Sequence, residues 1–319
     1  MTQTKNGFIW FGHHYGLIRF DGSNYRMFSH DPDNPESITS GRIFHISAQD
    51  SFLWLGSDTG GISRFNIYSH KSVNWRHKTS DKNTLASNFV DGLYAESDSV
   101  VWVSTGSFCL NKLNTATHQV ERYHPPIPYD WISNNKSAGP LYSILPDQDN
   151  DDLLWIGSPF GIYQFDKTKR SFTLFTPEPD QADYTLTTSC RDLIIDNQGR
   201  LWAGTGRMTD PGEGLLRYDP QSDNWKRFKV IEGTTESTYT NRISEILQIS
   251  ENELLAGTRN GNLWLINTQN DSISFLSDDI RQYGLSIGDV YTLLKTSDDD
   301  IWLGSEQLIR VNRNRRTFN

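Results

Sequence analysis

The sequence has few of the features that mark several large protein classes. Its 319 residues include two cysteines, Cys109 and Cys190. A disulfide-built fold is therefore excluded, although one Cys109–Cys190 bridge and two buried free thiols are both compatible with the sequence. No apolar run reaches the about 18 residues that a membrane-spanning helix needs. The N-terminal stretch also has no hydrophobic segment like that of a signal peptide.

Positive charge is also scarce. The chain has 30 Lys and Arg against 39 Asp and Glu, which gives a formal net charge of −9. The densest basic stretch runs only from Arg313 to Arg316, so the sequence predicts no nucleic-acid partner. Although only 35% of the residues are hydrophobic, 12% are aromatic and ten are Trp. This composition predicts a core filled by aromatic side chains.

Catalytic motifs are missing as well. The sequence has no Gly-x-Ser-x-Gly phrase, no phosphate-binding glycine loop between a strand and a helix, and no carboxylate pair that stands out for glycoside hydrolysis. His-x-His and His-x-x-x-His spacings are absent, so a metal site would have to be assembled from different repeats. We therefore expect no catalytic residue, no bound metal and no cofactor.

What the sequence does have is a repeated phrase. Leu53-Trp54-Leu55-Gly56-Ser57 is followed by Gly61-Ile62-Ser63-Arg64-Phe65-Asn66, and the chain contains seven copies of this pattern in all. The aligned positions are Trp10, Trp54, Trp102, Trp155, Trp202, Leu255 and Trp302. A period of about 40–50 residues with several short strands predicts propeller blades. We therefore expect an all-β, seven-bladed β-propeller of four-stranded antiparallel blades, forming a single domain over residues 1–319. The first blade lacks most of its inner strand.

The repeated positions predict structural roles. The periodic Trp residues are expected to fill the space between blades rather than to bind sugars. The glycines that follow Trp and those that precede the third strand are expected to adopt positive φ in tight turns. Each third strand closes on Asp or Asn, for which turn capping is favoured over calcium binding. These closing residues are Asp21, Asn66, Asn114, Asp166, Asp219, Asn267 and Asn312.

Some of these residues resemble a known family. Asn6–Gly12 with Gly16–Gly22, and the loop Asp31–Ile38, are similar to the opening repeat and the inter-blade loop of the two-component regulator propeller family. The resemblance implies the periplasmic sensor region of a larger membrane-anchored protein, whose output is a hybrid histidine kinase or a diguanylate cyclase. Several members sense oligosaccharides. Departures are Leu255 for Trp, Ser104 for Gly, and a longer turn from Gly206 to Gly212.

Up-and-down strand order places two kinds of loop at one edge of each blade. These are the turn between the second and third strands, here called the central turn, and the connection from the outer strand of one blade to the inner strand of the next, here called the blade connection. Arg and aromatic residues there can hold a sugar acid or another anionic ring-containing ligand. The candidate ligand-binding residues are Trp131, Arg42, Arg191, Arg207, Arg242, Arg259, His13, His14, Tyr15, Phe160 and Tyr239. Trp131 is the first choice, because it is a non-periodic Trp in a proline-rich loop.

Three alternatives stay open at this point. The arginines can instead pair with acids such as Asp58, Asp192 and Glu245. The protein can be an interaction scaffold rather than a ligand sensor, with a homodimer as one assembly. Virginiamycin-type lyases are also seven-bladed and use His and Glu with a metal, so His13 and His14 with Glu213 and Glu306 define an enzymatic alternative.

Overall fold

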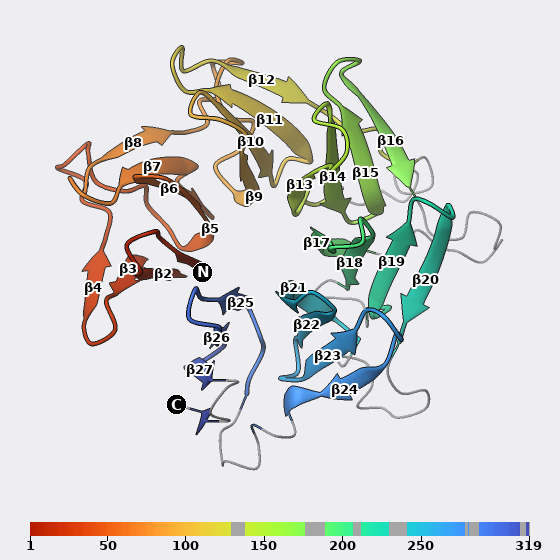
Figure 1. Cartoon of the computed structure of the whole chain (residues 1–319). Helices are drawn as coiled ribbons and strands as arrows, with labels where there is room; N and C mark the ends of the chain where they lie inside the picture. Colours follow the sequence, from red (N-terminus) through yellow and green to blue (C-terminus); the bar gives the residue numbers. More distant parts are fainter. Residues whose placement is uncertain are drawn as a thin grey trace. The chain divides into compact units, whose positions relative to one another are not determined.

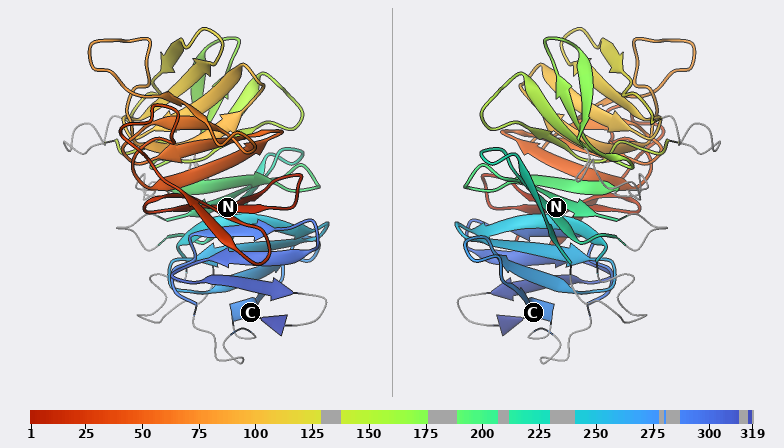
Figure 2. Two further views of the ribbon diagram at one scale, coloured as in Figure 1. Left: turned by 90° about the vertical axis from the view of Figure 1, so that its left-hand side faces the viewer. Right: turned by 90° about the vertical axis from the view of Figure 1, so that its right-hand side faces the viewer.

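The structure is a computed structural model that describes residues 1–128, 138–175, 189–206, 212–229, 241–277, 280, 287–312 and 317–318 (Figure 1). It contains seven four-stranded antiparallel sheets, each built from strands that are consecutive in the chain. The predicted fold class, an all-β seven-bladed β-propeller, is confirmed. The sheets are twisted, as the side views show (Figure 2), and this follows from the handedness of L-residue strands.

The chain divides into two compact units. The first holds Met1–Pro146, Asp152–Ile156 and Gln164–Thr173, and the second holds Asp147–Asp151, Gly157–Tyr163 and Leu174–Asn319. The boundary passes through the fourth blade. That residues 1–319 form one domain stays a prediction.

The first three blades lie in the first unit. Their strands are β1 (Thr2–Gln3), β2 (Ile9–His13), β3 (Gly16–Phe20), β4 (Tyr25–Phe28); β5 (Ile43–Gln49), β6 (Phe52–Ser57), β7 (Ile62–Asn66), β8 (Ser72–Trp75); and β9 (Val90–Ala95), β10 (Val100–Thr105), β11 (Cys109–Asn114), β12 (Val120–Tyr123). The inner strand β1 has two residues and pairs with β2. The prediction that the first blade lacks most of its inner strand is therefore confirmed.

The fourth blade contains β13 (Ile144–Pro146), β14 (Leu153–Ser158), β15 (Gly161–Asp166) and β16 (Ser171–Phe175). The remaining three blades belong to the second unit. Their strands are β17 (Cys190–Ile195), β18 (Leu201–Thr205), β19 (Leu215–Asp219), β20 (Asn224–Phe228); β21 (Ile243–Ser250), β22 (Glu253–Thr258), β23 (Leu263–Asn267), β24 (Ile273–Phe275); and β25 (Thr292–Lys295), β26 (Asp300–Gly304), β27 (Leu308–Asn312), β28 (Thr317–Phe318).

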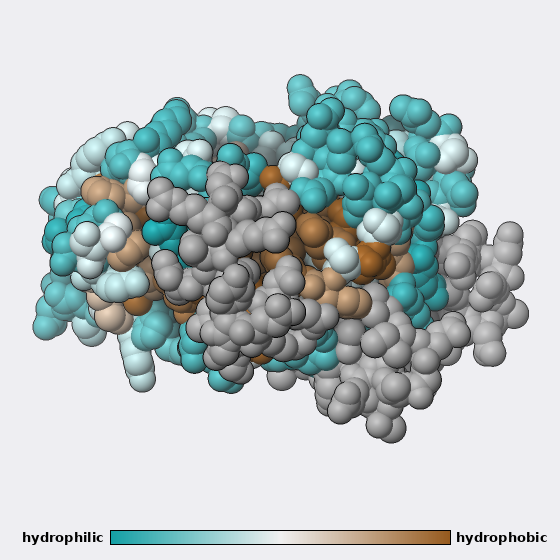
Figure 3. Space-filling model, turned by 60° about the horizontal axis from the view of Figure 1, so that its bottom comes forward, coloured by the Kyte–Doolittle hydropathy of each residue, from teal (hydrophilic) through white to brown (hydrophobic). Residues whose placement is uncertain are grey.

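The repeated Trp residues are core residues, as predicted. Six Trp side chains and Leu255 are each at most 7% exposed. Three of these indole N–H groups donate to an acceptor near the turn between the inner and second strands of their own blade. Trp54 donates to Gln49, Trp102 to Glu96 and Trp202 to Asp196. These three Trp side chains thus contribute a large buried apolar surface while their N–H groups stay hydrogen-bonded. Hydrophilic residues dominate the outer surface seen in Figure 3, with apolar side chains showing mainly between them.

One glycine prediction is wrong. The glycines that follow Trp lie inside strands, and none of Gly12, Gly56, Gly204 and Gly257 has positive φ. They are required because the next inner strand approaches closely: a Cβ on Gly12 would lie 2.0 Å from the Ile43 carbonyl oxygen. Ser104 occupies the same position in the third blade, where its hydroxyl donates to the Tyr142 carbonyl at 2.7 Å.

The other turn predictions are confirmed. The glycines before the third strands have positive φ at Gly16 (139°), Gly61 (79°), Gly161 (121°), Gly214 (79°) and Gly261 (77°). The closing Asp and Asn side chains accept backbone N–H groups two or three residues ahead, as Asn66 does from Tyr68 and Ser69. The same turn occurs at Asp21, Asn114, Asp166, Asp219 and Asn267. The Asn312 amide donates to Asp300, and the residues that directly follow Asn312 lie outside the described part of the chain.

Cys109 and Cys190 are both buried and free, so the disulfide alternative is excluded. Burial raises the pKa of the Cys109 thiol to about 12, which makes this thiol a poor nucleophile near neutral pH. Cys190 is fully buried in the core. In the part of the chain that the structure describes, no helix is both long and apolar enough to cross a bilayer.

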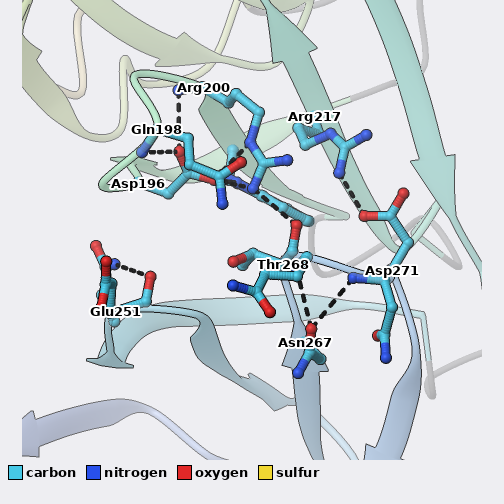
Figure 4. A network of polar contacts seen from close by, with 12 residues as sticks. Asp196, Gln198, Arg200, Arg217, Glu251, Asn267, Thr268 and Asp271 are labelled. Atoms are coloured by element: carbon cyan, nitrogen blue, oxygen red, sulfur yellow. Dashed lines mark hydrogen bonds and ion pairs between the residues drawn. The ribbon is translucent and has the colours of Figure 1, made fainter.

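A polar network joins the turn between the inner and second strands of the fifth blade to the turn between the third and outer strands of the sixth blade (Figure 4). Asp196 Oδ2 accepts from Arg200 Nε at 2.8 Å and from Trp202 Nε1 at 2.7 Å, and Arg200 Nη2 donates to the Thr268 carbonyl at 3.1 Å. Nearby, Asp271 accepts from Arg217 and Lys226. These contacts fasten consecutive blades at the edge away from the central turns.

Candidate functional site

The central turn and the blade connection pack together in the second, third, fifth and sixth blades. The turn residue donates its backbone N–H to the last residue before the inner strand: Asp58 to Arg42 at 3.2 Å, and Arg259 to Arg242 at 3.1 Å. Gly106 and Phe89, and Gly206 and Ser189, make the same bond. The expected common edge of the two kinds of loop is therefore confirmed in these blades, and we call it the turn edge.

The inner strands also bulge at this edge. Register shifts occur between Ile43 and His45 in β5, between Cys190 and Asp192 in β17, and between Ile243 and Glu245 in β21. A bulge leaves its extra residue unpaired with the neighbouring strand and redirects that side chain. The extra residues include Phe44 and Arg191, so one of the bulges helps to place a predicted candidate, Arg191.

In the first unit, three candidates form the exposed central turn of the first blade. His13, His14 and Tyr15 are all exposed, and Tyr15 is 73% exposed. The His13 ring lies 5.5 Å from the Tyr15 ring and 6.0 Å from the His14 ring, and the Tyr15 N–H donates to His13 Nδ1. This turn presents a small aromatic surface to solvent.

Arg42 is held by an acid, as one alternative predicted. Its Nε lies 2.9 Å from Asp58 Oδ2, and its guanidinium lies 4.9 Å from the centre of the Phe44 ring. Phe44 is 48% exposed and lies 6.1 Å from the Phe89 ring. The first unit thus carries a neutralised arginine over an exposed aromatic ring.

The second unit gathers three arginine candidates. Burial lowers the pKa of the Arg259 guanidinium from the usual arginine range. The positive charges of Arg191 and Arg242 lower this pKa further. The stem of Arg242 lies close to Gly206, where an added Cβ would be 2.8 Å from Arg242 Cγ. Arg191, Arg242 and Arg259 therefore form one cationic cluster, here called the arginine cluster.

Two residues of the next blade connection complete this arrangement. Val290 donates its N–H to the Thr258 carbonyl at 3.0 Å, which draws the connection against the central turn of the sixth blade. As a result, the Arg259 guanidinium lies 4.7 Å from the centre of the Tyr291 ring and 3.9 Å from Asp289 Oδ2. The latter distance is beyond hydrogen-bond reach. Tyr291 keeps 48% of its surface exposed.

Asp192 and Glu245 were expected in loops but lie on the inner strands β17 and β21. Both are half-buried, and Asp192 Oδ2 accepts the Ile246 N–H at 2.7 Å. Burial raises the pKa of both carboxyls, and the charge of Asp192 further raises the pKa of Glu245. The positive charge of Arg191 lowers the pKa of both carboxyls. These acids also join consecutive inner strands, so at least part of their role is structural.

The remaining candidates do not belong to this site. Phe160 is 2% exposed and belongs to the core, so its ring is not offered to a ligand. Trp131, Arg207 and Tyr239 lie outside the described residues. Sequence reasoning missed Phe44, Asp289 and Tyr291. Their signal was position alone, because Phe44 is the second residue of β5, and Asp289 and Tyr291 lie within the three residues before β25.

The residues of the enzymatic alternative do not form a metal site in the described part of the chain. No group of three His, Cys, Asp or Glu side chains there is arranged to hold a metal ion. Glu213 instead pairs with Arg227 and Lys229, while His13 and His14 remain exposed turn residues.

No protein-family model matches the chain. Among curated proteins, it is 24% identical over 316 residues to Histidine kinase P4 of Formosa agariphila, a match that covers 95% of this chain and 21% of that protein. The chain therefore spans about a fifth of this relative.

Solved structures with the same fold include two extracellular domains from B. thetaiotaomicron. One belongs to a putative hybrid two component system, with a TM-score of 0.73, 20% identity, and coverage of 95% of this chain and 38% of that one. The other belongs to a putative one component system, again with a TM-score of 0.73 and 20% identity, and covers 100% of this chain and 41% of that one. The resemblance to sensor propellers of two-component systems is thus confirmed: the chain has the fold of such extracellular domains and is similar in sequence to a histidine kinase.

Proposed function

We propose that this chain is the ligand-sensing, extracytoplasmic propeller module of a bacterial transmembrane signalling protein. In this proposal the chain itself is not catalytic. It binds a small molecule, an oligosaccharide or a sugar acid, at the turn edge, in the periplasm. The parent protein then carries the output, which is a histidine kinase or a diguanylate cyclase.

One observation carries the proposal: almost the whole chain matches the fold of extracellular domains of a putative hybrid two component system and a putative one component system. The matches cover 95% and 100% of this chain but about two fifths of those domains. The similarity to a histidine kinase supports the same class of parent protein. The turn edge supplies arginines and exposed aromatic rings, which are suited to a polar ring-shaped ligand.

Signalling would follow from unequal affinities. A ligand shifts an equilibrium between two states of the protein only by the difference between its free energies of binding to them. The ligand-bound chain must therefore favour one arrangement of the parent protein over another. No bond needs to be made or broken in the ligand.

A thermal-shift screen of the purified chain tests the proposal. The panel contains neutral oligosaccharides, sugar acids and divalent metal ions, because a ligand that binds the folded state raises Tm by mass action. Stabilisation by a carbohydrate class supports the sensor function. Stabilisation by metal ions alone, with turnover of a bound compound, would instead favour the lyase alternative. Capture of a protein partner by a chain that no small molecule stabilises would favour a scaffold.

A further inference from the structure

Two blades place different charges in the same backbone position. In the second blade, the paired residues of the turn edge are Arg42 and Asp58, whose side chains form an ion pair at 2.9 Å. In the sixth blade, the same backbone hydrogen bond joins Arg242 and Arg259. An arginine thus stands where the second blade has the neutralising aspartate, and a third arginine, Arg191, approaches from the bulge in β17.

This concentration of positive charge is costly to the protein. Burial is the main cause that lowers the pKa of Arg259, and the positive charges of Arg191 and, more weakly, Arg242 lower it further, while Asp289 and Tyr291 act in the opposite direction. The net charge of the chain is −9, so the cluster does not reflect a generally basic protein. Local repulsion of this kind is relieved when an anion binds between the guanidinium groups.

The aromatic ring beside the cluster adds a second recognition element. Tyr291 has Arg259 over its ring at 4.7 Å, yet 48% of the residue stays exposed. A ring of a bound ligand can pack on such an exposed aromatic surface. The neighbouring carboxyl of Asp289 is 40% exposed and offers hydrogen-bond acceptors to ligand hydroxyls.

We propose that Arg242 and Arg259, assisted by Arg191 and flanked by Tyr291 and Asp289, form a binding site for an oxyanion group carried on a polar ring. This inference rests on the proposed sensor function and specifies the ligand class. The oxyanion is a carboxylate or a sulfate ester, because both accept the forked N–H groups of arginine. Titration with glucuronate and with inorganic sulfate distinguishes the carboxylate from the sulfate.

The test is isothermal titration of the whole chain with D-glucuronate, glucose and inorganic sulfate at one ionic strength. Wild type is expected to bind glucuronate more tightly than sulfate and glucose. Arg259→Asp recreates the ion pair of the second blade, so this variant should raise Tm and weaken glucuronate binding by at least about tenfold, the scale for losing a charged contact. Tyr291→Ala should reduce the preference for glucuronate over sulfate.

Arg26→Asp is the matched control. It makes the same change of charge at an exposed position on the outer strand β4, so it should bind glucuronate as wild type does. If sulfate instead binds at least as tightly as glucuronate, with an affinity that Arg259→Asp abolishes, the oxyanion of the ligand is a sulfate ester and not a carboxylate.

Two results would overturn the inference. The first is a chain that binds neither glucuronate nor sulfate, and the second is an Arg259→Asp variant with unchanged affinity for both. If neutral oligosaccharides still stabilise the chain in either case, the oxyanion site fails while the sensor function stands. If no member of the carbohydrate panel binds wild type or the variant, both proposals fail.

Discussion

At the scale of single residues, buried carboxylates accept hydrogen bonds from the same blade and hold cations that contact the next blade. Asp196 is 2% exposed and accepts from Arg200, Trp202 and the Gln198 N–H. Trp102 and Glu96 repeat this arrangement in the third blade. Such a carboxylate accepts a hydrogen bond from the indole N–H of its own blade. It also binds a cationic side chain that contacts the next blade. Removal of such a group leaves several buried donors unpaired.

We therefore predict that Asp196→Ala lowers the free energy of unfolding by about 3 kcal/mol, because it leaves the Arg200 guanidinium buried without its acid. Urea denaturation monitored by Trp fluorescence measures this change. Asp50→Ala is the control, since its ion pair with Lys5 is exposed and its loss should lower the free energy of unfolding far less. Equal losses in the two variants would contradict the prediction.

A second prediction concerns Glu245. Its pKa is raised in the folded state, chiefly by burial and then by Asp192, so its contribution to stability is fully present below the unfolded pKa and is lost as pH rises through the folded pKa. Glu245→Gln should therefore be more stable than wild type at pH 8, by about 1 kcal/mol, the scale of one pKa unit. This advantage should shrink towards pH 5. Chemical denaturation at both pH values tests it, and a constant difference would contradict it.

At the scale of elements, the residue that ends the turn between the third and outer strands fastens neighbouring blades. His70, with φ of 59°, packs its ring 4.9 Å from Phe28 on β4 of the preceding blade. His118, with φ of 60°, accepts the Trp75 indole N–H at 2.9 Å in the same way. Arg170 and Asp271 occupy the equivalent place and form ion pairs with Glu121 and Lys226.

The His70 contact predicts a pH dependence. Burial, followed by the charges of Arg26 and Arg19, lowers the pKa of His70 below its ordinary value of 6.5. Its contribution to stability is then present above pH 6.5 and is lost as pH falls through the lower folded pKa. His70→Asn tolerates the positive φ and does not titrate, so it should flatten the fall in the free energy of unfolding between pH 7 and 5. Equal slopes for His70→Asn and wild type would contradict this assignment.

The same scale shows what the sequence can and cannot predict. The strands and turns followed from the Trp phrase, because every copy kept the same order of apolar, glycine and Asp or Asn positions. The role of Gly12 and Gly257 did not, because it depends on the approach of the next inner strand, about 30 residues later in the chain. Tyr291 was missed for the same reason: it meets Arg259 only through contact between consecutive blades. The bulge at Arg191 leaves no mark in the hydrophobic pattern.

At the scale of the whole molecule, the repeated contacts indicate that stability is distributed over many similar joints between neighbouring blades. Trp10, Trp54 and Trp202 each pack against the next blade, and polar contacts such as Arg200 with Thr268 and Lys167 with Glu96 join consecutive blades. In repeat proteins, stability is approximately a sum of repeat and nearest-neighbour terms. Glu96 lies in the first unit and Asp196 in the second, and they belong to different joints.

Glu96→Gln and Asp196→Asn should therefore have additive effects on the free energy of unfolding, within about 0.5 kcal/mol. Asp196→Asn combined with Arg200→Gln should not, because these side chains contact each other directly and the second substitution removes a donor that the first has already weakened. The comparison of the two double-mutant cycles by urea denaturation measures the difference. If the Glu96–Asp196 pair showed coupling as large as the Asp196–Arg200 pair, the joints could not be independent, and stability would have to be assigned to the chain as a whole.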